Sequence, residues 1–150
     1  MLTAGDEIRS LLGHYCRLID AGDFDGVGEL MAEAVLCTED GSPIARGAQE
    51  VAALYAGLVT RHPDGTPGTQ HVVTNTELSV EDADDPRVVA RSSYVVLQAL
   101  PDLPLQPIVT GSYVDTFDQD ATGRWRFVER RFTVGRAGNL DHHLAPGVIS

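Results

Sequence analysis

Apolar side chains recur with helical spacing along the first twenty residues of the chain. Thr3 followed by Asp6 is a helix start signal, and Gly22 is a stop signal. Between Thr3 and Gly22 the period of about 3.6 residues predicts an amphipathic helix with one buried face. The residues of that apolar stripe are Ile8, Leu11, Leu12, Tyr15, Leu18 and Ile19.

Two further helices are predicted before residue 62. A short helix fits Phe24 to Glu33, with Asp23 placed to cap its first turn. Val35 to Thr38 then has the composition of a strand, and the turn residues 39–43 return the chain toward Ile44. A longer helix runs from about Ala48 to Arg61 and ends in a segment rich in glycine and proline. Its apolar face consists of Val51, Leu54, Tyr55, Leu58 and Val59.

The hydrophobic period changes from about 3.6 to 2 after residue 68, which indicates β-structure. Short polar or proline-rich connections separate the predicted strands, so neighbouring strands should be antiparallel. Helices first and strands afterwards favour an α+β domain over residues 1–150, with the helices packed on one face of a curved, mainly antiparallel sheet. The mouth of such a cone is a natural small-molecule pocket. The predicted strands are Gln70 to Val80, Arg87 to Leu100, Pro107 to Asp118 and Arg124 to Gly135.

Composition and charge narrow the possible functions. The chain has 150 residues, 43% of them hydrophobic, so one domain with a substantial core is expected. A formal net charge of −11 disfavours binding to a phosphate backbone, and we expect no nucleic-acid partner. All eleven basic residues are arginines. The absence of lysine excludes a P-loop lysine and a Schiff-base amine.

Cysteine usage and apolar run lengths bear on the cellular compartment. Cys16 and Cys37 form no CxxC pair and are best interpreted as buried free thiols. The sequence at the N-terminus does not resemble a signal peptide, and no apolar run approaches the ~18 residues of a membrane span. We therefore expect a cytoplasmic protein that does not contact membranes.

Histidine is the side chain best suited to proton transfer near neutral pH, so the five histidines are the first candidates for chemistry. His14 lies on the polar side of the first helix and His62 in a turn-rich loop, so both should be exposed. His142 and His143 are adjacent and should point to opposite sides, which is poor geometry for one metal ion. No metal site is expected. His71 differs, because strand alternation places it with Asn75 on a mixed face that could line a pocket.

A partner carboxylate would turn His71 from an ordinary strand histidine into an effective base, by fixing its tautomer and stabilising the imidazolium. Asp20 and Asp23 lie near the end of the first helix, where side chains would face the mouth of the cone. Asp23 is explained as a helix cap, whereas Asp20 has no evident structural role. A helical wheel places Asp20 on the flank of the apolar stripe, so the pattern alone does not bring it to His71.

Four segments of the chain, taken in order, resemble one family. They are Tyr15-Cys16-Arg17-Leu18-Ile19-Asp20-Ala21-Gly22-Asp23, His71-Val72-Val73-Thr74-Asn75, Gly111-Ser112-Tyr113-Val114-Asp115 and Trp125-Arg126-Phe127-Val128-Glu129-Arg130-Arg131. Together they look like the SnoaL-like branch of the nuclear transport factor 2-like (NTF2-like) superfamily. This branch includes scytalone dehydratase, hexachlorocyclohexane dehydrochlorinase and polyketide cyclases. The resemblance implies a cone-shaped α+β barrel, but the fold alone does not imply one function.

The resemblance also implies roles for individual residues. Asp20 matches the acid and His71 the base of the dyad in the dehydratase and dehydrochlorinase members. Tyr15 stands where the dehydrochlorinase has a lysine, and Arg130 stands where it has an active-site arginine. Strand alternation lets only one of Arg130 and Arg131 face the pocket, grouping Arg130 with Val128 and Phe132 and Arg131 with Phe127, and spacing favours Arg130. Asn75, Tyr55 and Tyr94 are the expected substrate contacts.

The hypothesis that follows is a cofactor-independent lyase or isomerase that acts on a small apolar carbonyl compound, such as a polyketide-like or steroid-like intermediate. His71 would remove a proton next to the carbonyl, Asp20 would orient the imidazole, and Tyr15 and Arg130 would stabilise developing negative charge. Two alternatives remain: a non-catalytic binding or scaffold domain, like the small subunits of ring-hydroxylating oxygenases, and a cyclase that only holds a reactive substrate folded. The resemblance further implies a homodimer or homotrimer.

Overall fold

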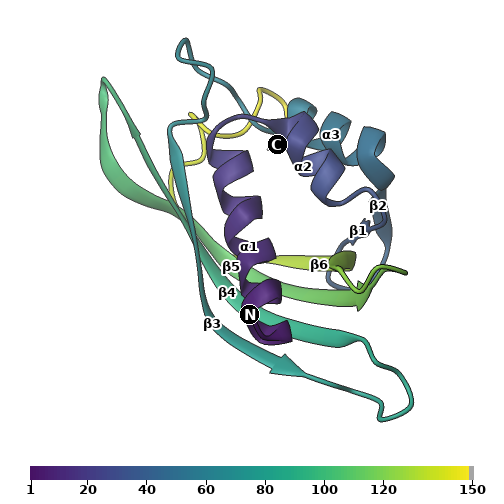
Figure 1. Cartoon of the computed structure of the whole chain (residues 1–150). Helices are drawn as coiled ribbons and strands as arrows, with labels where there is room; N and C mark the ends of the chain where they lie inside the picture. Colours follow the sequence, from purple (N-terminus) through teal and green to yellow (C-terminus); the bar gives the residue numbers. More distant parts are fainter. Residues whose placement is uncertain (149–150) are drawn as a thin grey trace.

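The computed structural model describes residues 1–148 and contains three helices and six strands (Figure 1). Among these residues, no helix has both the length and the hydrophobicity that crossing a membrane requires. In chain order the elements are α1 (Ala4–Asp20), α2 (Phe24–Leu30), β1 (Val35–Cys37), β2 (Pro43–Arg46), α3 (Gly47–Leu58), β3 (Thr69–Ser79), β4 (Val88–Leu100), β5 (Leu103–Gln119) and β6 (Trp125–Ala137).

The six strands form one mixed sheet in the order β2-β1-β6-β5-β4-β3. β1 runs parallel to β6, and all other neighbours are antiparallel. The sheet is strongly curved, and the three helices lie on its concave side (Figure 1). The predicted α+β architecture is therefore confirmed, as a cone that stays open between the edge strands β2 and β3.

The first helix forms as its sequence predicts. The side chain of Thr3 accepts a hydrogen bond from the amide of Asp6, and the Asp6 carboxylate accepts one from the amide of Thr3, which makes a capping box. Ile8, Leu12 and Ile19 of the apolar stripe are at most 3% exposed. This buried face holds α1 against the sheet and brings its last turn next to β3.

Several predicted boundaries differ from the observed ones. α2 ends at Leu30 rather than Glu33, and α3 ends at Leu58 rather than Arg61. α3 stops early because Val59 is extended and pairs with Leu144 of the C-terminal segment. The proline-rich segment predicted as a connection between strands belongs mostly to β5, which begins at Leu103. The chain around Ile44 forms an additional short strand, β2, which pairs with β1.

Two of the irregularities in strand register affect residues for which the sequence predicts a face of the sheet. In β6 the pairing with β5 shifts by one residue, with Thr116 opposite Glu129 and Phe117 opposite Phe127. Phe127 and Arg130 are consequently both buried, so the prediction that Phe127 shares a face with Arg131 is wrong. In β3 the register shifts between Thr74 and Glu77. Asn75 lies in that interval with a φ of 55° and is exposed.

Gly111 in β5 permits a close approach that any larger residue would prevent. A Cβ atom at this position would overlap the carbonyl oxygen of Thr133 and the ring of Tyr94, whose hydroxyl donates a hydrogen bond to that same carbonyl at 3.1 Å. The aromatic ring of Tyr94 stacks on that of Tyr113 with a centroid distance of 4.4 Å. Gly111 therefore allows Tyr94 and Tyr113 to stack on the sheet.

We predict that Gly111→Ala lowers the free energy of unfolding by about 2–3 kcal/mol, because either the strand or the Tyr94 ring must move. Urea denaturation measures the change. Gly57→Ala in α3 is the matched control, because a Cβ there meets no atom within 4 Å and should be neutral or slightly stabilising. Equal effects of the two substitutions would contradict the prediction.

Candidate functional site

A cavity of about 160 Å³ lies between the helices, the concave face of the sheet and the C-terminal segment. This volume is similar to the ~150 Å³ space that holds one benzene ring in a protein core. Val134 belongs to its wall and is 56% exposed, so the cavity opens to the surface there. Most of its wall is aliphatic. The lining residues whose side chains carry a nitrogen or oxygen atom are Tyr15, Tyr55, His71, Tyr94, Tyr113, Arg130 and His143.

Asp20 and His71 form a hydrogen-bonded pair at the edge of this cavity. Oδ1 of Asp20 lies 2.6 Å from Nδ1 of His71, and Oδ2 accepts a hydrogen bond of 2.8 Å from the backbone amide of the same residue. The hydroxyl of Thr69 donates a third bond, of 2.9 Å, to Oδ1. The side chain of Asp20 is 19% exposed and that of His71 is 6% exposed. The position of the carboxylate is therefore fixed by three donors of β3.

This geometry sets the proton arrangement of the imidazole. An ionised carboxylate accepts only, so the ring nitrogen next to it must carry hydrogen. In the neutral ring the other nitrogen, Nε2, then holds a free lone pair. Since His71 lines the cavity, that lone pair is the proton acceptor available to a bound ligand.

A buried ion pair contributes to another part of the cavity wall. Nε and Nη2 of Arg130 donate to the two carboxylate oxygens of Asp115 at 2.7 and 2.9 Å. Both side chains are at most 1% exposed. Burial alone would lower the pKa of Arg130, but the Asp115 carboxylate outweighs it, so the pKa is raised and the guanidinium stays charged. Nη1 is buried without a partner among the described residues.

Aromatic rings enclose the guanidinium of Arg130. Its central carbon lies 3.7 Å from the ring centre of Tyr113 and 4.2 Å from that of Tyr15. The hydroxyl groups of Tyr15 and Tyr55 are 3.0 Å apart, so one donates to the other and one hydroxyl hydrogen remains for a ligand. Burial raises the pKa of both phenols, which keeps them protonated. This cluster offers hydrogen-bond donors and a positive charge to an oxygen atom.

The structure brings together most of the residues that the sequence predicts for the site. His71, Tyr15, Tyr55, Tyr94 and Arg130 all line the cavity, and Asp20 contacts His71 from behind. Asn75 does not line it, because the β3 irregularity turns that position to the surface. Arg131 also lies outside, where it pairs with Glu129 at 2.7 Å.

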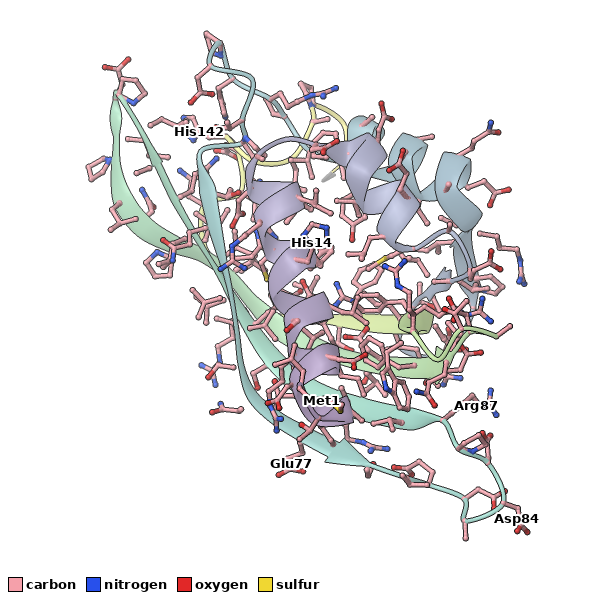
Figure 2. The ribbon with its side chains drawn as sticks, in the orientation of Figure 1. Met1, His14, Glu77, Asp84, Arg87 and His142 are labelled. Atoms are coloured by element: carbon pink, nitrogen blue, oxygen red, sulfur yellow. The ribbon has the colours of Figure 1, made fainter. Side chains whose placement is uncertain are left out.

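His143 and Tyr113 are cavity residues that the sequence analysis did not assign to the site. His142 is exposed and His143 buried, so the two neighbours point apart as expected, but His143 points into the site. The exposed His14 and His142, labelled in Figure 2, lie on α1 and on the C-terminal segment. The available signal was the spacing of Leu140, His143 and Leu144, which matches one helical turn and places all three in the cavity wall.

Within residues 1–148, no three or more histidine, cysteine, aspartate or glutamate side chains come together in a cluster that could hold a metal ion. The two cysteines, Cys16 and Cys37, are buried free thiols, as expected. Burial raises the pKa of Cys16 to about 11, so its thiol is protonated at neutral pH.

Comparison with known proteins gives a family and a fold. The family model of the SnoaL-like domain matches residues 1–131. An NTF2-like protein from Novosphingobium aromaticivorans is 24% identical with a TM-score of 0.68, and the match covers 87% of this chain and 80% of the other. ActVI-ORFA from Streptomyces coelicolor is 18% identical with a TM-score of 0.70, over 88% and 98% of the two chains. A candidate scytalone dehydratase from N. aromaticivorans is 19% identical with a TM-score of 0.64, over 89% of each chain. No protein of curated function matches the chain.

We predict that Arg130→Met destabilises the protein by about 3–5 kcal/mol, because it leaves the Asp115 carboxylate buried without its partner. Arg131→Met is the matched control. It removes a neighbouring pair whose side chains are 43% and 36% exposed, and should cost less than about 1 kcal/mol. Urea denaturation of the two variants compares the costs. Similar small costs would show that Arg130 and Asp115 do not form a buried pair in solution.

The buried imidazole of His143 predicts a pH dependence of stability. Desolvation, with a smaller contribution from His71, lowers the pKa of His143 to about 4 from 6.5, while Asp20 acts in the opposite direction. The unfolded chain therefore binds this proton first, and stability should fall by about 2–3 kcal/mol as the pH drops from 6.5 to 4. Urea titrations across this range should show a smaller fall for His143→Phe than for the wild type. Parallel curves for the two proteins would refute the prediction.

Proposed function

Because the chain belongs to the SnoaL-like domain family and carries a carboxylate–imidazole pair at an apolar cavity, we propose that it is a cofactor-independent lyase or isomerase for a small apolar carbonyl compound. The observation that carries the proposal is the contact of Asp20 with Nδ1 of His71. This contact orients Nε2 as a base. The aliphatic wall of the cavity favours a substrate with few polar groups. Because the cavity fits about one ring, a polyketide-like or steroid-like intermediate would place its reacting ring there and extend through the opening at Val134.

The first step of the proposed reaction is proton abstraction by His71. Nε2 takes a proton from the carbon next to the carbonyl. The electron pair of the broken C–H bond forms a C=C bond, and the π pair of the carbonyl moves to its oxygen, giving an enolate. The resulting imidazolium is stabilised by the carboxylate of Asp20, which keeps its own negative charge. Asp20 thus acts as a positioning residue through His71.

The enolate oxygen needs hydrogen-bond donors in a site from which water is largely excluded. Arg130 has one buried nitrogen, Nη1, without a partner among the described residues. The Tyr15–Tyr55 pair has one uncommitted hydroxyl hydrogen. Both groups line the same cavity as His71, so we assign the stabilisation of the enolate to Arg130, Tyr15 and Tyr55.

Two outcomes are available to the enolate. In a conjugated enolate, return of the proton from His71 to a different carbon gives an isomer. Where the β-carbon carries a hydroxyl group, that oxygen takes the proton from His71 and leaves as water while the C–O bond breaks, which gives the unsaturated carbonyl product and returns His71 to its neutral form. Both outcomes share the first step, so proton abstraction is the step to test. Tyr94 and Tyr55 serve as substrate contacts in this proposal, and self-association as a homodimer or homotrimer remains a prediction.

The test is hydrogen exchange on 2-tetralone, a bicyclic ketone with acidic α-protons, followed in D₂O by NMR. The wild type should accelerate loss of the α-proton signals above the buffer rate. His71→Ala should reduce that acceleration by about 10² to 10⁴, the usual contribution of a general base, and Asp20→Asn should also reduce it strongly because the tautomer is no longer fixed.

His14→Ala is the matched control, because it removes an exposed histidine of α1 and should leave the exchange rate unchanged. If the wild type does not accelerate exchange, or if His71→Ala behaves like His14→Ala, the lyase or isomerase proposal fails. The chain is then better described as a binding domain that uses the same cavity without chemistry.

A further inference from the structure

His143 is a buried polar side chain that the mechanism above does not use. It is 6% exposed, and its Nδ1 has no hydrogen-bond partner among the described residues. Buried polar atoms of native proteins nearly always have a partner, so an unpartnered one in a cavity wall indicates a place for a ligand atom. The ring belongs to the wall of the same cavity as His71.

The C-terminal segment holds this side chain in a defined position. The carbonyl of His143 accepts a hydrogen bond of 2.8 Å from the amide of Thr60, and the amide of Ala145 donates one of 2.8 Å to Leu58. On the other side, the side-chain amide of Gln98 donates to the carbonyl of His142 at 3.1 Å. The backbone around His143 is therefore joined both to the end of α3 and to β4.

The rings of His143 and His71 lie close enough to share one ligand atom. Their centres are 6.4 Å apart and their planes are inclined by 59°. Nδ1 of His71 is used by Asp20, so Nε2 is the nitrogen left for a ligand. A ring nitrogen lies about 1 Å from the centre of its ring, so nitrogens that face each other across this distance are about 4 Å apart. Two hydrogen bonds of about 2.9 Å through a single oxygen atom span that gap.

Burial favours the neutral form of His143. Desolvation is the largest cause that lowers its pKa to about 4; His71 and His62 act in the same direction, and Asp20 opposes them. A neutral imidazole has one donor and one acceptor, so it binds a hydroxyl or a carbonyl oxygen without requiring a charged ligand.

We propose that His143 is a ligand-binding residue whose imidazole forms a hydrogen bond with a hydroxyl or carbonyl oxygen of an apolar ring compound, at the end of the cavity formed by the C-terminal segment. This inference rests on the proposed function only for the location of the ligand site. It does not depend on any step of the proposed reaction. A ligand of this class has an apolar body against the aliphatic wall and an oxygen atom between His143 and His71.

The experiment compares binding of 2-naphthol and naphthalene, which differ by one hydroxyl group, by NMR titration of the isotope-labelled protein. The wild type should bind 2-naphthol more tightly. His143→Phe keeps an aromatic ring without a polar atom and should reduce this preference about five- to tenfold, the size expected for one lost hydrogen bond. His143→Asn places an amide near the position of Nδ1 and should restore part of the preference. His142→Phe, at the exposed neighbour, is the matched control and should not change it.

The inference is overturned if His143→Phe retains the wild-type preference, or if the wild type binds 2-naphthol no better than naphthalene. It is also overturned if His143→Phe weakens both compounds equally, because His143 then only shapes the cavity. Neither titration needs turnover. A protein that fails the 2-tetralone exchange test but shows the hydroxyl preference supports this inference while contradicting the proposed function.

Discussion

The carboxylate of Asp20 joins the end of α1 to the edge strand β3, and the geometry of the candidate site depends on that junction. Its two oxygens accept bonds from the Thr69 hydroxyl, the His71 amide and the His71 ring. β3 has a sheet neighbour on one side only, so these bonds help to fix an element that the sheet holds through β4 alone. One group therefore sets both how the helix end meets the sheet and which imidazole nitrogen is free.

Another part of the cavity wall depends on a buried charge, the guanidinium of Arg130. Arg130 is held by Asp115 and lies between the rings of Tyr15 and Tyr113. The pair has no net charge, so it contributes mainly by holding a hydrogen-bond donor of the guanidinium at a fixed position inside an apolar wall. The net charge of the protein, −11, is consequently no guide to the potential that a bound molecule meets.

The sequence was informative where a regular period determines the structure. The apolar stripe of α1 and the change to a period of 2 predicted the helices, the long strands and the α+β class, because burial of one face dominates such elements. The prediction that Asp20 pairs with His71 depended on family resemblance instead. A helical wheel describes the faces of a continuous helix, whereas Asp20 is the last residue of α1 and its side chain reaches the neighbouring strand.

The failures have local causes. One extra residue in β6 changed the face of Phe127, and the irregularity in β3 exposed Asn75, since alternation holds only while register is unbroken. Proline residues suggested a connection where β5 already runs beside β4. His143 was missed because its segment makes a single turn, and the spacing of one turn is too short to establish a helical period.

The C-terminal segment differs from the rest of the cavity wall in how much of the fold depends on it. The match to the SnoaL-like family spans residues 1–131, which include the dyad, Arg130 and the tyrosines, whereas Leu140, His143 and Leu144 follow it. The segment adds no strand to the sheet and meets α3 through one isolated bridge. Substitutions in this segment therefore change the shape of one end of the cavity while leaving the strands and the core beneath them in place.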